Sequence, residues 1–469
     1  MSDTGTPVAG LGSAAASIAG PISAETAALL PPPPGSSSPR LLQELRITVR
    51  GGAYASASRR RYGEVFTIRT AFVGDLALVS HPDHARSLFT AASELAPSIA
   101  GESQLRPIVG DTSVLTAVGD RHLRQRKLLL PSFKGEAIER YVAAIEAITE
   151  RELARWPIGR GFALAPRMQS ITLDVILSGV FGIDGRPARA SPEGRLRAAI
   201  ARTVRASTLP GAKLAELLNM GKQRPIGPVK AVMTMLDAAV YPVIAARRRD
   251  PQLEQRRDIM SVLLLTRTED GEALTDLELR NELLTLLLAG HETTANQLAW
   301  TWERLLRTPA AHDRLRDAVR GSDDALAGTV VEQTIWESMR NRPVIPAVGR
   351  RVTVPWQFGD YAIPAGTAVG ISILLLHHRE DLYPDPYAFR PERWQGVTQP
   401  GTYTWLPFGG GVRRCLGATL AMAEQRVVLR AMAERLELVA EEPRHETATH
   451  RNVTMIPRRG ARAVLVARR

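Results

Sequence analysis

Residues 408–417 read FGGGVRRCLG, in which three glycines and two arginines lead to Cys415, the only cysteine in the chain. One cysteine cannot form an internal disulfide. A zinc site needs several further ligands, and no cluster of Cys or His surrounds Cys415. The glycines fit neither a phosphate loop, because no Lys-Ser or Lys-Thr follows them, nor a dinucleotide loop, whose third glycine position is Arg414.

Two simpler roles for Cys415 explain less of the stretch than a metal ligand does. The thiol could be a small buried side chain, or a nucleophile with a histidine base that the sequence leaves open. A thiolate ligand is stabilised by cations and N–H groups, and the helical pattern 416–436 places a helix N-terminus beside Cys415. Glycines let the backbone pass close to a flat cofactor, and Arg413 offers a cation to a carboxylate on its edge.

The pattern Phe408-x-x-Gly411-x-Arg413-x-Cys415-x-Gly417 resembles the haem-ligand loop of the cytochrome P-450 superfamily. The resemblance implies haem b (iron protoporphyrin IX) as the cofactor and Cys415 as the metal ligand. It makes the other four residues of the pattern cofactor-binding. The fold class that it implies is mostly α with small β-sheets, in the triangular cytochrome P-450 fold with a long central helix over the haem.

A long helix is predicted for Asp276–Leu306, because Thr275 and Glu278 fit a capping box and residues 283–290 are apolar nearly all round. At 1.5 Å per residue this helix would extend about 45 Å and cross the domain. Its middle reads AGHETT at residues 289–294, and a glycine with two β-branched threonines is a poor choice for a helix interior. A zinc-protease interpretation fails, because Ala295 stands where the second histidine would be.

The resemblance assigns roles to four residues of this helical motif. Ala289 and Gly290 would lie over the haem, where their small side chains make room for dioxygen. Glu292 and Thr293 would form the acid–alcohol pair that guides protons to the bound oxygen. We therefore expect the catalytic residues to be Glu292 and Thr293.

Glu337 and Arg340 lie three residues apart, a spacing that alone is more typical of an ion pair on a solvated helix. Their position ahead of the segment FRPERW, residues 389–394, matches the family's Glu-x-x-Arg helix. The resemblance makes Arg393 the third member of a buried network that braces the cysteine loop. Trp394 replaces the phenylalanine that is usual there. We expect a role in fold and haem retention, not in chemistry.

His122 and Arg126 lie one helical turn apart and share a helix face. An exposed basic helix would explain the sequence RHLRQRK at residues 121–127 equally well. The resemblance makes both residues ligands of the haem propionates, with Arg350 as a third cation.

The rest of the body is expected to be mostly helical. Further helices are predicted at Glu136–Trp156, Leu164–Phe181 and Pro228–Arg248. Strands are predicted for a hairpin of Val65–Arg69 and Leu76–Val79, for Gln357–Ile363 and Thr367–Ile373, and after Leu436. Repeats of 20–50 residues are absent from the sequence, which excludes solenoids and propellers.

The composition is that of a globular protein with a basic surface. The 469 residues are 44% hydrophobic and 23% charged, with a net charge of +12. The arginines are scattered, and no basic stretch interleaved with aromatic residues is present, so nucleic acid is not an expected partner. A solvated basic surface or an acidic protein partner explains the charge better.

Residues 1–39 are rich in Ala, Gly, Ser and Pro, and they are expected to be a flexible tail before a single domain at 40–469. They hold no Lys or Arg, so the positive region of a signal peptide is missing. No uninterrupted apolar run of about 20 residues fits a membrane span there. We expect a cytoplasmic protein without a membrane span, and a monomer.

The function expected from these features is a haem-thiolate monooxygenase that inserts one atom of O₂ into a small lipophilic substrate. Its electrons would come from a ferredoxin and a ferredoxin reductase, since no reductase follows the last predicted strands. Two alternatives remain: a peroxide-using or rearranging haem enzyme of the same fold, which usually lacks the acid–alcohol pair, and a non-enzymatic haem-binding sensor. Residues 85–115 and 185–230 resemble the family least, and the substrate pocket is built there, so the substrate stays open.

Overall fold

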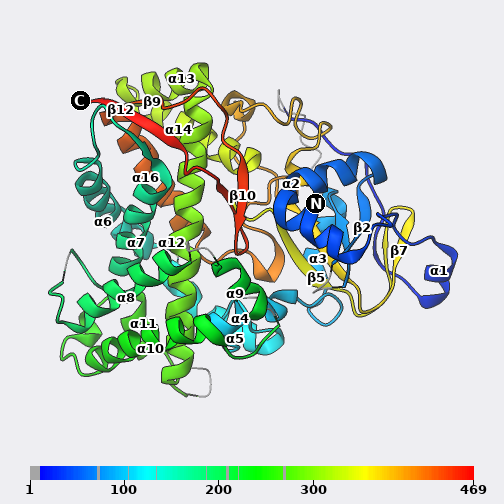
Figure 1. Cartoon of the computed structure of the whole chain (residues 1–469), viewed down its shortest axis with the longest axis horizontal. Coiled ribbons are helices and arrows are strands. Elements are labelled where there is room, and N and C mark those ends of the chain that lie inside the picture. Colours follow the sequence, from blue (N-terminus) through cyan, green and yellow to red (C-terminus); the bar gives the residue numbers. More distant parts are fainter. Residues whose placement is uncertain are drawn as a thin grey trace.

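Helix α12 (Asp276–Leu306) is the axis of the fold, and it runs through the middle of the computed structural model (Figure 1). Both halves of the predicted capping box form: the Thr275 hydroxyl accepts from the Glu278 N–H at 3.2 Å, and the Glu278 carboxylate accepts from the Thr275 N–H at 3.0 Å. The helix has both predicted ends. The structure describes residues 11–70, 74–103, 105–133, 135–185, 187–207, 211–219, 221–267 and 271–469.

A helical layer packs on one side of α12, with α7 as its main neighbour. These helices are α6 (Glu136–Leu153), α7 (Leu164–Phe181), α8 (Pro192–Ala206), α10 (Gly227–Arg248), α11 (Ile259–Leu265), α13 (Pro309–Arg320), α14 (Asp324–Asn341) and α16 (Ala418–Arg435). Helix α9 (Ala212–Asn219) follows α8 in the chain but lies on the other side of α12 (Figure 1). The predicted helices near 136–156, 164–181 and 228–248 are confirmed as α6, α7 and α10, with ends that differ by up to three residues.

The small sheets lie mainly on the opposite side of α12, with the N-terminal helices (Figure 1). Helices there are α1 (Ala24–Leu29), α2 (Arg40–Tyr62), α3 (Pro82–Thr90), α4 (Arg106–Val109), α5 (Gly119–Leu129) and α15 (Ile373–His377). The largest sheet has the order β2-β3-β8-β5, with β3 and β8 parallel. Its strands are β2 (Val65–Arg69), β3 (Asp75–Val79), β8 (Ala368–Ser372) and β5 (Ala347–Arg351). The predicted hairpin is confirmed as β2 and β3.

Three smaller sheets complete the described structure. Their orders are β1-β6-β7, β4-β12-β9 and β10-β11. The strands are β1 (Ala19–Pro21), β4 (Gly161–Ala163), β6 (Trp356–Phe358), β7 (Tyr361–Ile363), β9 (Leu436–Ala440), β10 (Ala448–Arg451), β11 (Thr454–Pro457) and β12 (Arg462–Arg468). The strand predicted for Gln357–Ile363 is instead a hairpin, because Gly359 adopts a φ of 58° and reverses the chain.

Residues 11–39 differ from the flexible tail expected for residues 1–39; residues 1–10 lie outside the described residues. Strand β1 pairs with β6, and the Gly12 N–H donates to the Leu382 carbonyl at 2.9 Å. The small residues have a packing role here. A Cβ on Gly12 would stand 1.8 Å from the Asp381 carbonyl oxygen, and one on Gly35 would stand 2.4 Å from that of Thr67. The glycines therefore permit close contact with the body.

Helix α10 is the one helix of the described residues that is long and apolar enough to cross a membrane by length and composition. It packs on α8 and α12, and residues such as Leu236, Val240 and Ile244 are buried in these contacts. Its apolar stretch is 33% buried in the structure, and length and composition alone do not assign α10 to a membrane.

Candidate functional site

The cysteine loop is shaped by two glycines in the left-handed backbone region and by α3. Gly409 and Gly411 each have a φ of 65°. A Cβ on Gly410 would stand 2.6 Å from the Phe89 ring, and one on Gly411 would stand 2.1 Å from the Phe89 carbonyl oxygen. Gly410 and Gly411 thus let the loop pack on the end of α3, a protein contact that the sequence did not reveal.

Cys415 stands at the end of this loop, three residues before α16 begins. Its N–H donates to the Phe408 carbonyl at 2.9 Å, which closes the loop, and its side chain is exposed. The protein packed around the thiol removes part of its hydration and raises the pKa of Cys415, against the opposing effects of the Gly417 N–H and of Arg414 and Arg126, although one side of the residue is open. The protein alone therefore does not favour the thiolate, whereas a bound metal ion would, because it deprotonates a coordinating thiol outright.

A nucleophile or a zinc site fits Cys415 less well. Among the described residues, no histidine forms a hydrogen bond with Cys415. The general base that a nucleophilic cysteine requires is therefore not in contact with it. In the part of the chain that the structure describes, there is no group of three or more Cys, His, Asp or Glu side chains that could hold a metal ion. If Cys415 binds a metal, the other metal ligands would therefore have to come from a cofactor.

Three arginines and one histidine gather near the cysteine loop. They are His122 and Arg126 on α5, Arg350 on β5 and Arg413 in the loop. Burial, followed by the charges of Arg413, Arg126 and Arg350, lowers the pKa of His122 to about 4. Burial, followed by Arg350 and Arg126, lowers the pKa of Arg413 to about 10. The sequence predicted all four residues, and the structure brings them close enough to perturb one another.

This cationic group lacks an acidic partner within the described residues. Arg413 instead donates to the carbonyls of Leu115, at 3.2 Å, and Ala117, and Arg126 donates to that of Arg414 at 2.8 Å. Burial lowers the pKa of Arg350 to about 10. Clustered cations that oppose one another's charge are expected where an anion binds. The donors therefore fit the two carboxylates of a haem.

Phe89 links the cationic group to the cysteine loop. The Arg350 guanidinium lies 5.5 Å from the centre of the Phe89 ring. The same ring is the contact of Gly410, so Phe89 stands between the two. Sequence analysis missed this residue, because an apolar residue in a helix gives no signal of its distant contacts.

The middle of α12 presents a small opening in an otherwise buried helix. Ala289 is exposed, whereas Leu286 and Leu287 before it are buried. Thr293, one turn further on, donates its hydroxyl to the Ala289 carbonyl at 2.5 Å. Ala289 and Thr293 therefore share one face of α12, as a pair that acts on one bound molecule requires.

Gly290 lies against a different neighbour from the one that the resemblance implied. A Cβ on this residue would stand 2.4 Å from Cδ1 of Ile176 on α7. The position that a side chain would occupy at Gly290 thus faces α7. Because glycine has no side chain, α12 and α7 can approach each other closely here. Making room for dioxygen, expected of both small residues, fits Ala289 better.

Glu292 is held by the β10–β11 hairpin. Its carboxylate lies 2.7 Å from Nε of Arg451 and accepts from the Thr454 hydroxyl at 3.3 Å. Glu292 and Thr293 are adjacent in sequence, so their side chains leave the helix about 100° apart. The acid and the alcohol therefore face different parts of the protein.

Glu337 is the centre of the expected buried network. Its two oxygens accept from Arg340 at 2.7 and 2.8 Å and from Nε of Arg393 at 3.1 Å. The Arg390 N–H adds a bond of 2.8 Å, and the Trp394 indole N–H adds one of 3.1 Å. The tryptophan that departs from the family pattern thus supplies a donor that phenylalanine lacks.

The network reaches the cysteine loop through residues that the sequence did not indicate. Arg340 donates to the His377 carbonyl at 2.9 Å, and Nε2 of His377 accepts from the Leu406 N–H at 2.7 Å. Burial lowers the pKa of His377 to about 3, with a further lowering by Arg340. A neutral His377 therefore holds Leu406, two residues before the loop begins.

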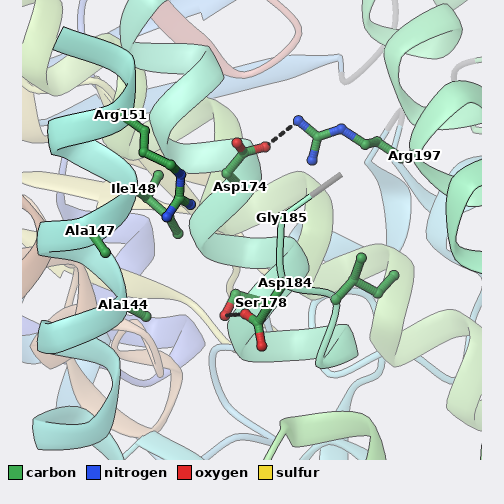
Figure 2. A pocket seen from close by; sticks show the side chains of 10 residues that line it. Ala144, Ala147, Ile148, Arg151, Asp174, Ser178, Asp184, Gly185 and Arg197 are labelled. Atoms are coloured by element: carbon green, nitrogen blue, oxygen red, sulfur yellow. Dashed lines mark hydrogen bonds and ion pairs between the residues drawn. The ribbon is translucent and has the colours of Figure 1, made fainter. Parts of the chain in front are cut away.

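A cavity of about 180 Å³ lies apart from this site, between α6, α7 and residues 183–185 (Figure 2). Asp174 pairs with Arg197 at 2.5 Å across its rim, and Ser178 donates to Asp184 at 2.6 Å. The predicted site residues are not among those that line it. Its polar groups are paired with one another, which does not suit an apolar substrate.

Known proteins resemble the chain over most of its length. The cytochrome P-450 family model matches residues 32–462. Cytochrome P-450 137 of Mycobacterium tuberculosis is 37% identical over 418 residues, which cover 86% of this chain and 83% of the relative. Cytochrome P-450 135B1 of Mycobacterium bovis is 38% identical over 436 residues, which cover 90% of each chain.

Solved structures agree on the fold. Retinoic acid-bound cyanobacterial CYP120A1 superposes with a TM-score of 0.78 at 22% identity, over 93% of this chain and all of that one. CYP102L1 gives a TM-score of 0.77 at 22% identity, over 94% of this chain and 99% of that one. The predicted fold class is confirmed by these superpositions. With the cysteine loop, the central helix and the Glu-x-x-Arg network in place, the chain belongs to the cytochrome P-450 family of haem-thiolate monooxygenases.

Proposed function

We propose that this enzyme inserts one atom of O₂ into a small apolar organic substrate, by hydroxylation or epoxidation, with electrons from a separate redox protein. The observation that carries the proposal is the pairing of one cysteine just before α16 with three arginines and a histidine, for which the described residues provide no acidic partner. Thiolate-ligated haem b fits both, through its iron and its two carboxylates. Bound in this way, the haem supplies the activation of dioxygen.

The protein's own residues hold the cofactor and exclude water around it. Cys415 is the metal ligand, and Phe408 and Gly417 flank it along the loop. His122, Arg126, Arg350 and Arg413 are the carboxylate-binding group. The three arginines donate charge-assisted hydrogen bonds, which are about twice as strong as neutral ones. His122, whose pKa is lowered to about 4, donates as a neutral imidazole.

The α12 residues handle space and protons. Ala289 leaves room for a diatomic molecule on the exposed spot of the helix. The Thr293 hydroxyl, beside it, holds a proton at Oγ1 and can pass it on from that position. Glu292 is the acid from which Thr293 would be resupplied.

The electron donor in this proposal is an acidic ferredoxin that docks near Arg414. Arg414 is exposed beside Cys415, and Arg126 fixes its backbone. The net charge of +12 favours an acidic partner. Steered association of this kind weakens with salt, because the screening length falls to about 8 Å at physiological ionic strength.

Carbon monoxide binding to the reduced protein tests the cofactor assignment. The wild-type protein should show the red-shifted Soret band that is characteristic of thiolate-ligated haem, and Cys415→Ala should lose it. Arg435→Ala, an exposed arginine at the end of α16, is the control and should keep the band. A Cys415→Ala protein that retains the band would overturn the assignment.

Stopped-flow reduction by a ferredoxin over a salt series tests the docking site. Arg414→Glu should slow the first electron transfer and flatten its salt dependence, with unchanged substrate affinity. Arg202→Glu, an exposed arginine on α8, should leave the rate unchanged. A rate that is insensitive to both salt and Arg414→Glu would remove this docking site from the proposal.

The substrate class is tested by spectral shifts on binding of a library of lipophilic compounds. Compounds that shift the Soret band are then incubated with O₂, NAD(P)H, ferredoxin and its reductase. An oxygenated product supports the proposal. Turnover with hydrogen peroxide alone would favour the peroxide-using alternative, and a protein that binds gases but no lipophilic compound would favour a sensor.

A further inference from the structure

Helix α2 turns an apolar face to solvent. Leu41, Leu45 and Val49 follow one another at intervals of four residues, and their exposed fractions are 75%, 58% and 65%. Leu42, next to them, is 39% exposed. Residues four apart lie on one side of a helix, so these side chains form one continuous stripe, the α2 stripe. Single exposed leucines are normal, but a contiguous stripe marks a contact surface.

The opposite face of α2 is anchored to the protein by a polar residue. Gln43 is fully buried, and its amide donates to the carbonyls of Ser36, at 3.1 Å, and Ser38, at 2.7 Å. Its amide oxygen accepts from the Arg69 N–H of β2 at 3.1 Å. Ile47 and Tyr54 pack beside it on a small core of β2 and β3. The helix is therefore docked without the α2 stripe, and packing among the described residues does not explain the apolar residues there.

Arginines flank the α2 stripe. Helix α2 contains six arginines and one acidic residue. Arg46 is exposed on one flank, and Arg40, which pairs with Asp75 at 3.0 Å, begins the other; Arg50 is exposed at a kink of the helix just after Val49. A second copy of the chain would bring like charges together if two such faces met. Protein interfaces are also enriched in aromatic residues at their centre, whereas the α2 stripe is aliphatic. An apolar stripe between cations is the pattern of a helix that lies in the surface of an anionic lipid bilayer.

We propose that the α2 stripe and its flanking arginines bind the surface of an anionic phospholipid membrane. The leucines and Val49 enter the boundary between headgroups and acyl chains, and Arg46 and Arg50 contact lipid phosphates. The binding is peripheral and reversible, because one short helix face buries little apolar area. It brings the enzyme to the phase in which lipophilic compounds concentrate.

Sedimentation of the haem-loaded, full-length protein with lipid vesicles tests this proposal. Mixed phosphatidylcholine–phosphatidylglycerol vesicles should bind the protein, and phosphatidylcholine vesicles should bind it weakly. The triple variant Leu41→Gln, Leu45→Gln, Val49→Gln should bind at least about tenfold more weakly. Arg46→Gln and Arg50→Gln should each weaken binding to mixed vesicles by roughly fivefold. Leu326→Gln, a 50% exposed leucine on α14, is the matched control and should bind as the wild type does.

The substituted side chains are exposed, so the triple variant should keep its haem spectrum and thermal midpoint, which are measured in parallel. Failure of the wild type to bind mixed vesicles would overturn the proposal, as would equal binding by the triple variant. Equal binding to both kinds of vesicle would refute the role of the arginines. A wild-type dimer that the triple variant converts to a monomer would assign the α2 stripe to a second copy of the chain.

Discussion

Replacing Trp394 by phenylalanine, the residue usual in the family, should destabilise this protein. The indole N–H donates to Oε2 of Glu337 at 3.1 Å, and both residues are fully buried. A hydrogen bond to a charged group contributes about 1.5–3 kcal/mol to stability. Phenylalanine removes this donor and leaves a small void, so the free energy of unfolding should fall by the sum of the two effects.

Trp302 on α12 provides a control for the void. It is also fully buried, and it stacks edge-on against His312 at 5.7 Å, as Trp394 does against Trp336 at 5.8 Å. Its indole N–H has no hydrogen-bond partner among the described residues. Trp302→Phe therefore removes the same volume without breaking a hydrogen bond. Trp302→Phe also relieves the cost of burying an unpaired N–H, so the difference between the two variants contains this relief and the lost bond to Glu337, and it should be at least about 1.5–3 kcal/mol.

The measurement is urea unfolding followed by circular dichroism at one haem loading for all three proteins. Comparing the two variants is more reliable than absolute free energies, because a protein with a tightly bound cofactor departs from two-state unfolding. Trp394→Phe should also release haem faster than Trp302→Phe, since Glu337 organises the segment that leads to the cysteine loop. Equal unfolding midpoints and equal haem release would refute the contribution of the indole N–H.

Three further results are expected. Glu337→Ala leaves Arg340 and its neighbours without a buried counter-charge, which should cost about 3–5 kcal/mol; soluble protein with full haem content and wild-type stability would contradict this. Thr293→Ala should keep haem and substrate binding but divert electrons to hydrogen peroxide, measured as peroxide per NAD(P)H; wild-type coupling would exclude Thr293 from proton delivery. Glu282, whose Oε2 is unpaired among the described residues, has a pKa raised to about 8 by burial. Because the pKa of Glu282 is raised in the folded protein, stability falls as pH rises from about 4.5 to 8. Glu282→Gln should therefore raise the thermal midpoint at pH 8 and have little effect at pH 4.5. Equal effects at the two pH values would contradict this.

Features that depend on one continuous stretch of sequence could be predicted from its residues. The capping box, the apolar run and the helix end of Asp276–Leu306 are local, and both predicted ends are confirmed. The spacing of Arg413 and Cys415 is likewise contained in a single loop. Glu337 and Arg340 share one helix. Arg393 follows Arg340 by 53 residues, and only the resemblance indicated that it would contact Glu337.

Contacts between distant segments could not be predicted from the residues alone. Phe89 supports the cysteine loop through glycines more than 300 residues away, and His377 holds Leu406 through a backbone N–H. A phenylalanine in a helix or a histidine in an apolar run has many possible neighbours, and the sequence does not select among them. The composition of the N-terminus predicted a flexible tail, and the contacts of residues 11–39 with the body could not be foreseen for the same reason. Gly12 and Gly35 are small because other backbone segments pass close by, and the composition is equally typical of a flexible tail.

The position of Glu292 gives the proposed proton path a direction. Arg451 binds its carboxylate from the β10–β11 hairpin, and the Arg451 and Glu292 side chains are 16% and 13% exposed. Thr293 leaves the helix about 100° away from Glu292, and its hydroxyl donates to the Ala289 carbonyl. In the proposed function, Glu292 therefore collects protons on the hairpin side of α12, and Thr293 delivers them beside Ala289. The ion pair with Arg451 occupies the Glu292 carboxylate. Supply through α12 then depends on how readily Arg451 releases the carboxylate, a property that the two adjacent side chains do not determine by themselves.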